Sequence, residues 1–189
     1  MLALFALIGF AQAGVLSFVD KGVQIEGGSA GSFVLGYPVL DTSAGKLSAS
    51  ERKLGEEAIL SYPSGIGVKL SLVGDKKIVL KFSGDTGGIK TFRMGDLLIP
   101  MHFSEGGEWK IGESEKKVFP REKPAKPFLF QGNAASFEFS SPEGGAIRFT
   151  LPPYSFQQFQ DNREWKWDTF AWFFQTAFSK DAAAYEVSV

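Results

Sequence analysis

The residues whose types and spacing could do chemistry are concentrated between positions 154 and 178. Aromatic rings there are interleaved with amide and charged side chains, and the segment holds Trp165, Trp167 and Trp172, three of the four tryptophans. Sugar rings present C–H faces that stack on aromatic rings, and their hydroxyls hydrogen-bond to amide, carboxylate and guanidinium groups. The segment therefore favours the binding of a polysaccharide or an oligosaccharide.

Trp165 and Trp167 are the expected stacking residues, because charged residues flank both of them. Alternation along a strand would place the two indoles on the same side. Trp109, within the irregular stretch 104–126, is the other tryptophan expected to be exposed. The alternative is that the aromatics form the core, which is the favoured interpretation for 170–178. The expected polar contacts to the ligand come from Gln160, Asp161, Asn162 and Arg163.

A catalytic alternative is a polysaccharide lyase or glycoside hydrolase, since glycoside hydrolysis uses two carboxyl groups at a characteristic separation. The chain's only histidine, His102, and Arg163 would assist if they lie in the same cleft. Surface ion pairs with Arg163 and Lys166 are the favoured interpretation of the same carboxylates. The candidate carboxylates are Asp161, Glu164 and Asp168.

Several function classes find no support in the sequence. The absence of cysteine excludes disulfides, thiolate metal sites and a cysteine nucleophile. No nucleophile elbow, Walker A loop or dinucleotide fingerprint is present. A net charge of -1 without a basic block makes nucleic acid an unfavourable partner. We expect no cofactor and no metal centre, apart from a structural calcium ion conceivable at Asp75, Asp85 or Asp96 in glycine turns.

The elements that must position these residues are short strands. Nineteen phenylalanines suit pleated, half-buried surfaces, and 22 glycines supply the turn conformations. Apolar and polar residues alternate with period two along 68–72 and 78–82, so 58–83 is predicted to be a three-stranded antiparallel meander. The same alternation recurs between 128 and 151 and along 154–161, and 185–189 is a plausible closing strand.

Two segments leave alternatives open. Residues 44–55 fit a short helix or a polar loop, since Ser48 and Glu51 have capping-box spacing. Residues 169–178 fit both a helix and a strand, and their aromatic density favours the strand. With at least ten candidate strands and no βαβ alternation, we predict a jelly-roll-like, two-layer antiparallel β-sandwich with at most one or two short helices. Residues 14–189 form its single domain.

The first residues resemble an export signal. An apolar run ending at Phe10 precedes Ala11, Gln12 and Ala13, which form an A-x-A cleavage signature, so 1–13 is predicted to be a signal peptide. The alternative is a buried first strand. The run is too short for a membrane-spanning helix of about 20 residues. We therefore expect a secreted or periplasmic protein.

The signal, the glycine-punctuated strands and the glutamine- and tryptophan-rich stretch 157–165 together resemble the carbohydrate-binding-module-like β-sandwich domains of secreted bacterial polysaccharide-degrading enzymes. The resemblance implies non-catalytic glycan binding, or support of a catalytic partner domain or protein. It carries no motif that transfers binding residues by position. A third interpretation is a structural or protein-interaction domain of the cell envelope, with the aromatic segment wholly internal.

Overall fold

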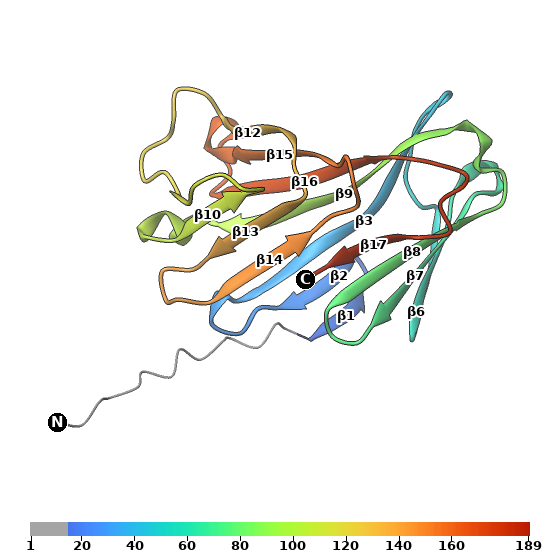
Figure 1. Ribbon diagram of the computed structural model, residues 1–189, viewed down its shortest axis with the longest axis horizontal. Coiled ribbons are helices and arrows are strands. Elements are labelled where there is room, and N and C mark those ends of the chain that lie inside the picture. The colour runs from blue at the N-terminus through green and yellow to red at the C-terminus, as the bar shows by residue number, and fades with distance from the viewer. Residues whose placement is uncertain (1–14) are drawn as a thin grey trace.

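The strands of this protein form two antiparallel sheets packed face to face, so the predicted all-β sandwich is confirmed. The structure is a computed structural model that describes residues 15–189. Figure 1 shows an elongated molecule with the two sheets in two layers. The expected signal peptide, residues 1–13, lies outside the described residues.

The eight-stranded sheet has the order β1-β2-β3-β9-β16-β15-β12, and β4 pairs with β3 beside this path. Neighbouring strands are antiparallel throughout, so the sheet needs no helical crossover. Its strands are β1 (Leu16–Val19), β2 (Gly22–Glu26), β3 (Ser32–Thr42), β4 (Gly45–Leu47), β9 (Ile89–Pro100), β12 (Phe128–Asn133), β15 (Phe156–Asp161) and β16 (Thr169–Ala177).

The nine-stranded sheet has the order β11-β10-β13-β14-β17-β8-β7-β6-β5. The predicted meander is confirmed, because β6, β7 and β8 pair consecutively and antiparallel. The strands of this sheet are β5 (Glu51–Leu54), β6 (Glu57–Ser61), β7 (Gly67–Val73), β8 (Lys77–Ser83), β10 (Glu108–Ile111), β11 (Lys117–Val118), β13 (Ser136–Ser140), β14 (Ala146–Thr150) and β17 (Tyr185–Ser188).

Helical structure within residues 15–189 consists of five short 3₁₀ segments, where the sequence predicted one or two short helices at most. None of these segments is long and apolar enough to cross a membrane. The helix considered for 44–55 does not form, since this stretch contains β4 and β5. The 3₁₀ segments are η1 (Gly28–Ala30), η2 (Pro63–Gly65), η3 (Thr86–Gly88), η4 (Met101–Glu105) and η5 (Asn162–Trp165).

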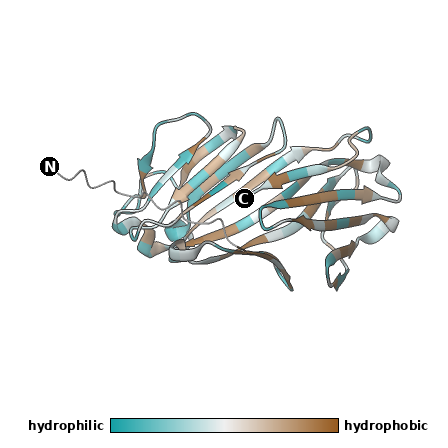
Figure 2. Cartoon of the chain, turned by 60° about the horizontal axis from the view of Figure 1, so that its bottom comes forward, coloured by the Kyte–Doolittle hydropathy of each residue, from teal (hydrophilic) through white to brown (hydrophobic). Residues whose placement is uncertain are grey.

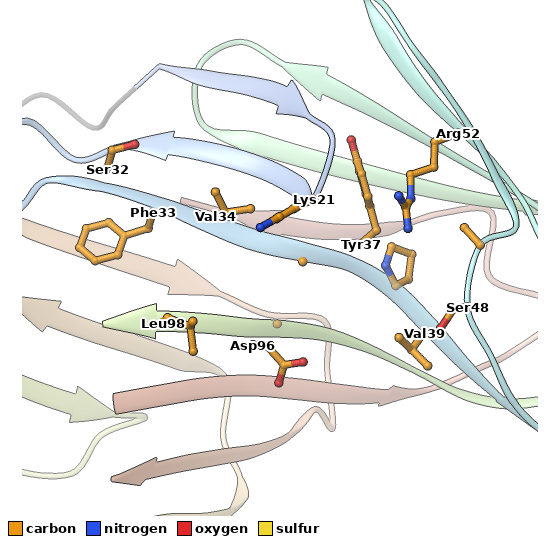
Figure 3. Close-up of a pocket in the computed structure, with 14 residues that line it drawn as sticks. Lys21, Ser32, Phe33, Val34, Tyr37, Val39, Ser48, Arg52, Asp96 and Leu98 are labelled. Carbon is orange, nitrogen blue, oxygen red and sulfur yellow. The ribbon is translucent and has the colours of Figure 1, made fainter. Parts of the chain in front are cut away.

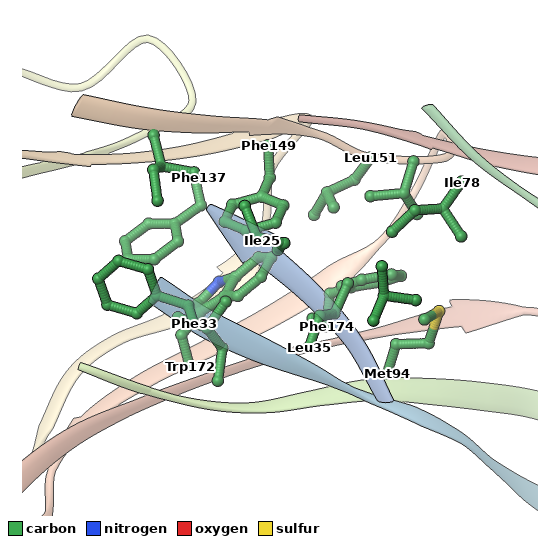
Figure 4. Packing of buried hydrophobic residues seen from close by; sticks show 14 of the residues in the cluster. Ile25, Phe33, Leu35, Ile78, Met94, Phe137, Phe149, Leu151, Trp172 and Phe174 are labelled. Carbon is green, nitrogen blue, oxygen red and sulfur yellow. The ribbon is translucent and has the colours of Figure 1, made fainter. Parts of the chain in front are cut away.

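The core lies between the sheets because most strands direct alternate residues inward. Figure 2 shows hydrophobic and hydrophilic residues alternating along several strands. The choice of strand for 169–178 is confirmed by β16, whose inward side chains include Trp172. The Trp172 ring stacks on Phe137 at a centroid separation of 4.7 Å and lies 4.8 Å from Phe149 (Figure 4). Rings from the two sheets thus interdigitate, and the core interpretation of 170–178 holds for Phe170, Trp172 and Phe174.

Candidate functional site

Trp165 and Trp167 are exposed, with 46% and 62% of their surfaces accessible. The prediction that they share one side of a strand is wrong, because Trp165 closes η5 and Lys166 follows with a left-handed φ of 63°. The Trp167 main-chain N–H donates to the Asn162 carbonyl at 3.2 Å, which folds the turn back on itself. The Trp165 ring lies 6.4 Å from the ring of Phe128, so this indole lies beside the start of β12.

Asp161 and Arg163 form a buried ion pair at the start of this turn. Asp161 is 1% exposed, and its Oδ1 accepts from the Arg163 main-chain N–H and from Nε, both at 3.0 Å. Oδ2 accepts from Arg163 Nη2 at 2.5 Å. Both groups are therefore occupied within the protein and are unavailable for the sugar contacts predicted for them.

Arg163 also binds the loop that contains residues 120–123. The hydrogen bonds that Arg163 donates to Asp161 raise the pKa of the guanidinium above its ordinary value, so the group stays charged. Lys123 from the same loop pairs with Glu164 at 2.6 Å. The turn that carries Trp165 is consequently held to a loop distant in sequence. The guanidinium donates to the main-chain carbonyl oxygens of Pro120 at 2.9 Å, Arg121 at 2.6 Å and Glu122 at 3.1 Å.

Four amide side chains on the outer face of the eight-stranded sheet form a continuous hydrogen-bonded row, which we call the amide row. Gln131 Nε2 donates to Gln158 Oε1 at 2.9 Å, and Gln158 Nε2 donates to Gln160 Oε1 at 2.6 Å. Gln160 Nε2 donates to Asn162 Oδ1 at 2.8 Å, and Asn162 Nδ2 donates to Thr169 Oγ1 at 3.0 Å. All four bonds run in one direction, so each amide is held by its neighbours in the row.

The period of β15 creates this row. Phe156, Gln158 and Gln160 point outward while the residues between them are buried. Phe156 is 36% exposed at one end, with the almost fully exposed Tyr154 beyond it. Asn162 at the other end is buried, so it anchors the row rather than offering the ligand contact predicted for it. The six-residue advance from Phe156 to Asn162 spans about 20 Å.

The outer face continues across the strands from the amide row to β3. Gln158 pairs in register with Phe173, Phe173 with Gly95, and Gly95 with Gly36. The guanidinium carbon of Arg93 lies 3.8 Å over the centroid of the Phe173 ring. The row of amides is therefore followed by an aromatic ring, and then by two residues without side chains.

The two glycines cannot be replaced by larger residues without a clash. A Cβ on Gly36 would lie 2.3 Å from the Gly95 carbonyl oxygen. Gly95 has a φ of +137°, and a Cβ there would lie 2.4 Å from the Phe173 Cβ. Above them is a pocket of about 480 Å³ (Figure 3). A smaller pocket of about 120 Å³ adjoins it at Val39.

Trp109 is buried, so the expectation that it is exposed is wrong. It is 4% exposed because β10 joins β13 and directs the indole against Phe159, at a centroid separation of 5.1 Å. The Lys117 ammonium covers the ring at 5.2 Å. The stretch 104–126 thus contributes strands β10 and β11 to the sandwich, and Trp109 leaves the candidate site.

The residues considered for catalysis and for calcium lie in several different elements. His102 lies exposed in η4 rather than in a strand. Asp96 pairs with Arg93, while Asp85 accepts the Gly87 main-chain N–H at 3.3 Å. Within residues 15–189, no group of three or more histidine or acidic side chains is placed to hold a metal ion.

Sequence reasoning missed most of the outer face. The alternation along 154–161 already places Phe156, Gln158 and Gln160 on one side, which was the available signal. Gln131 and Phe173 join the outer face beside β15 only through strand pairing, which the sequence does not specify. The site rests on its own geometry, since no family model, no curated protein and no solved structure matches this chain.

Proposed function

We propose that this protein is a secreted, non-catalytic carbohydrate-binding β-sandwich domain whose ligand lies on the outer face of the eight-stranded sheet. The observation that carries the proposal is the amide row, which has accessible aromatic rings beyond both of its ends. This arrangement combines oriented hydrogen-bonding groups with stacking surfaces on one face, as sugar recognition requires.

The amides keep capacity for a ligand. A primary amide has two N–H donors and two lone pairs on its oxygen. Gln158 uses one N–H and one lone pair inside the row, and Gln160 does the same. The remaining donors and acceptors can bind sugar hydroxyls. Because neighbouring amides already fix the side chains, less rotamer entropy is lost when the ligand binds.

The aromatic rings lie far enough apart for a chain of sugars rather than a single ring. Phe156 stands at one end of the row. Trp165, with Trp167 two residues further on, lies near the other end beside Phe128, which pairs with Gln160 about 13 Å along β15 from Phe156. These three rings supply the stacking surfaces in the proposal. The ligand class is accordingly a polysaccharide or an oligosaccharide of several units.

Two of the three candidate carboxylates form ion pairs within the protein, which supports binding without catalysis. Asp161 is held by Arg163, and Glu164 is held by Lys123. Hydrolysis of a glycosidic bond needs one carboxyl as acid and a second as base or nucleophile. The proposal therefore includes a catalytic partner, as a separate domain or protein. It also includes export directed by residues 1–13.

Affinity electrophoresis on a panel of plant and algal polysaccharides tests the proposal. We expect at least one polysaccharide to retard the protein. Replacing both exposed indoles (Trp165→Ala with Trp167→Ala) or both central amides (Gln158→Ala with Gln160→Ala) should abolish most of the retardation. Ile59→Ala removes a comparably exposed apolar side chain from the other sheet and should leave the retardation unchanged.

Unchanged mobility on every polysaccharide would contradict the proposal, as would retardation that survives both double variants. Each variant must keep the wild-type circular dichroism spectrum, so that a lost interaction is not confused with lost folding. Release of reducing ends or unsaturated products from the same polysaccharides would contradict the non-catalytic part alone.

A further inference from the structure

The pocket of about 480 Å³ on the outer face has an apolar interior and a charged rim. Its floor is the main chain of Gly36 and Gly95. Val34, Tyr37 and Leu98 are among the side chains that form its walls. The Tyr37 hydroxyl donates to the Val19 carbonyl at 2.8 Å, and partial burial raises its pKa to about 12, so the ring is a fixed, uncharged wall.

Two cations stand at one side of this pocket. Lys21, from the turn between β1 and β2, is exposed and has no ion-pair partner among residues 15–189. Arg52 from β5 lies 3.7 Å from Asp20, whose side chain is 87% exposed. Figure 3 shows Lys21 and Arg52 on the opposite side of β3 from Asp96. An exposed pair at this separation is weak, so a ligand anion can compete for Arg52.

The single carboxylate that lines the pocket is already neutralised. Asp96 bonds to Arg93, whose guanidinium in turn lies over the Phe173 ring. An approaching anion therefore meets Lys21 and Arg52 without an uncompensated carboxylate in the lining. The local charge favours an acidic ligand over a basic one.

The pocket and the amide row lie on one continuous surface. The path from β15 through β16 and β9 to β3 crosses three strand spacings, or about 14 Å. Gln158, Phe173, Gly95 and Gly36 follow one another along it in register. A glycan that binds along β15 can thus extend across the neighbouring strands and enter the pocket with another part.

We infer that the glycan is acidic, and that the pocket binds the carboxylate or sulfate group of one of its sugars between Lys21 and Arg52. This inference rests on the proposed function and adds the substrate class. The apolar walls accept the ring of that sugar, and the two cations bind its oxyanion. A carboxylate and a sulfate ester share this chemistry, because both present several oxygens to a guanidinium or an ammonium.

Calorimetric titration of the whole chain with matched ligand pairs tests the inference. Polygalacturonate and alginate are each compared with their carboxyl-reduced forms, and carrageenan with its desulfated form. We expect each single variant, Lys21→Gln or Arg52→Gln, to weaken binding of an acidic glycan about threefold, and the double variant to weaken it about tenfold. Lys81→Gln removes one exposed positive charge from the other sheet and should have no effect.

The salt dependence gives a second readout. At an ionic strength of about 1 M, where the Debye length is about 3 Å, binding of the acidic form should approach that of its neutral counterpart. A salt effect on the polygalacturonate and alginate pairs identifies the bound oxyanion as a carboxylate, and one on the carrageenan pair identifies it as a sulfate. Binding by the neutral forms should not respond to the variants.

Three outcomes distinguish a failure of the acidic-glycan inference from a failure of the proposed carbohydrate binding. Acidic and neutral forms that bind equally, with no effect of the double variant, overturn the inference and leave carbohydrate binding intact. Neutral forms that bind better than their acidic parents also overturn it. If no glycan of either kind binds, the proposed function and the inference both fall.

Discussion

The outer faces of the two sheets differ in kind, although both arise from the same period-two alternation. On the nine-stranded sheet several exposed charges are paired: Lys69 with Glu57 at 2.8 Å, and Lys77 with Glu186 at 2.9 Å. On the eight-stranded sheet, β15 carries uncharged amides that bond to one another. The first face therefore presents exposed ion pairs to solvent. Around β15, the second face is polar but uncharged and has aromatic rings beside it, which suits a ligand rich in hydroxyl groups.

The same contrast holds for the ion pairs themselves. Glu138 and Arg148 face each other across β13 and β14 at 3.8 Å, and both are accessible to water. Asp161 and Arg163 are closer and almost fully enclosed. An exposed pair contributes little to stability, whereas a buried carboxylate that loses its partner is costly. The Asp161–Arg163 pair is therefore structural, whereas the Glu138–Arg148 pair contributes little to stability.

The largest expected effect on stability comes from breaking the buried ion pair. Arg163→Ala should destabilise the fold by about 3 kcal/mol, because it leaves the buried Asp161 carboxylate without its partner. Arg148→Ala, the matched change on the other sheet, should cost less than about 1 kcal/mol. Urea denaturation of both variants measures the difference, and equal midpoints would contradict the structural role of the buried pair.

A second pair of variants compares glycines on the two sheets. Gly36→Ala should destabilise by about 2 kcal/mol, since its Cβ would meet the Gly95 carbonyl oxygen at 2.3 Å. Gly55→Ala, between β5 and β6, has open space around the new Cβ and should be close to neutral. Thermal melts followed by circular dichroism test this. A Gly36→Ala variant as stable as the wild type would show that the pocket floor can move.

A third pair of variants compares an inward and an outward glutamine on β15. Gln157 points into the core, where its Oε1 accepts from Trp172 Nε1 at 2.9 Å and its Nε2 donates to the Ala134 carbonyl at 2.9 Å. Gln157→Ala leaves these buried groups without partners and should cost about 1.5 kcal/mol. Gln158→Ala, on the outer face, should change the free energy of unfolding by less than about 0.5 kcal/mol. A larger cost for Gln158→Ala in chemical denaturation would mean that the amide row is a structural support.

The strands behind the site were largely predictable from sequence. Alternation along 154–161 and aromatic density along 169–178 predict β15 and β16, and both are confirmed. The strand β5 was not predictable, because all four of its residues are exposed and so carry no apolar alternation. Main-chain pairing with β6 alone holds it in place.

The site itself was only partly predictable. Charged neighbours correctly pointed to exposure for Trp165 and Trp167. The expectation for Trp109, which came from its place in the irregular stretch 104–126, was wrong because β10 adds to the sheet. The carbonyls that bind Arg163 lie 41 to 43 residues away in sequence, so no local pattern reveals them. Pairing between β12 and β15 likewise brings Gln131 to the row.

The most direct test follows the side-chain amide resonances by NMR during titration with whichever polysaccharide fragment is bound. The account predicts that the NH₂ signals of Gln131, Gln158 and Gln160 shift together, while those of the buried Gln157 stay in place. Shifts confined to residues away from the outer face of β15, with the amide row unperturbed, would contradict it.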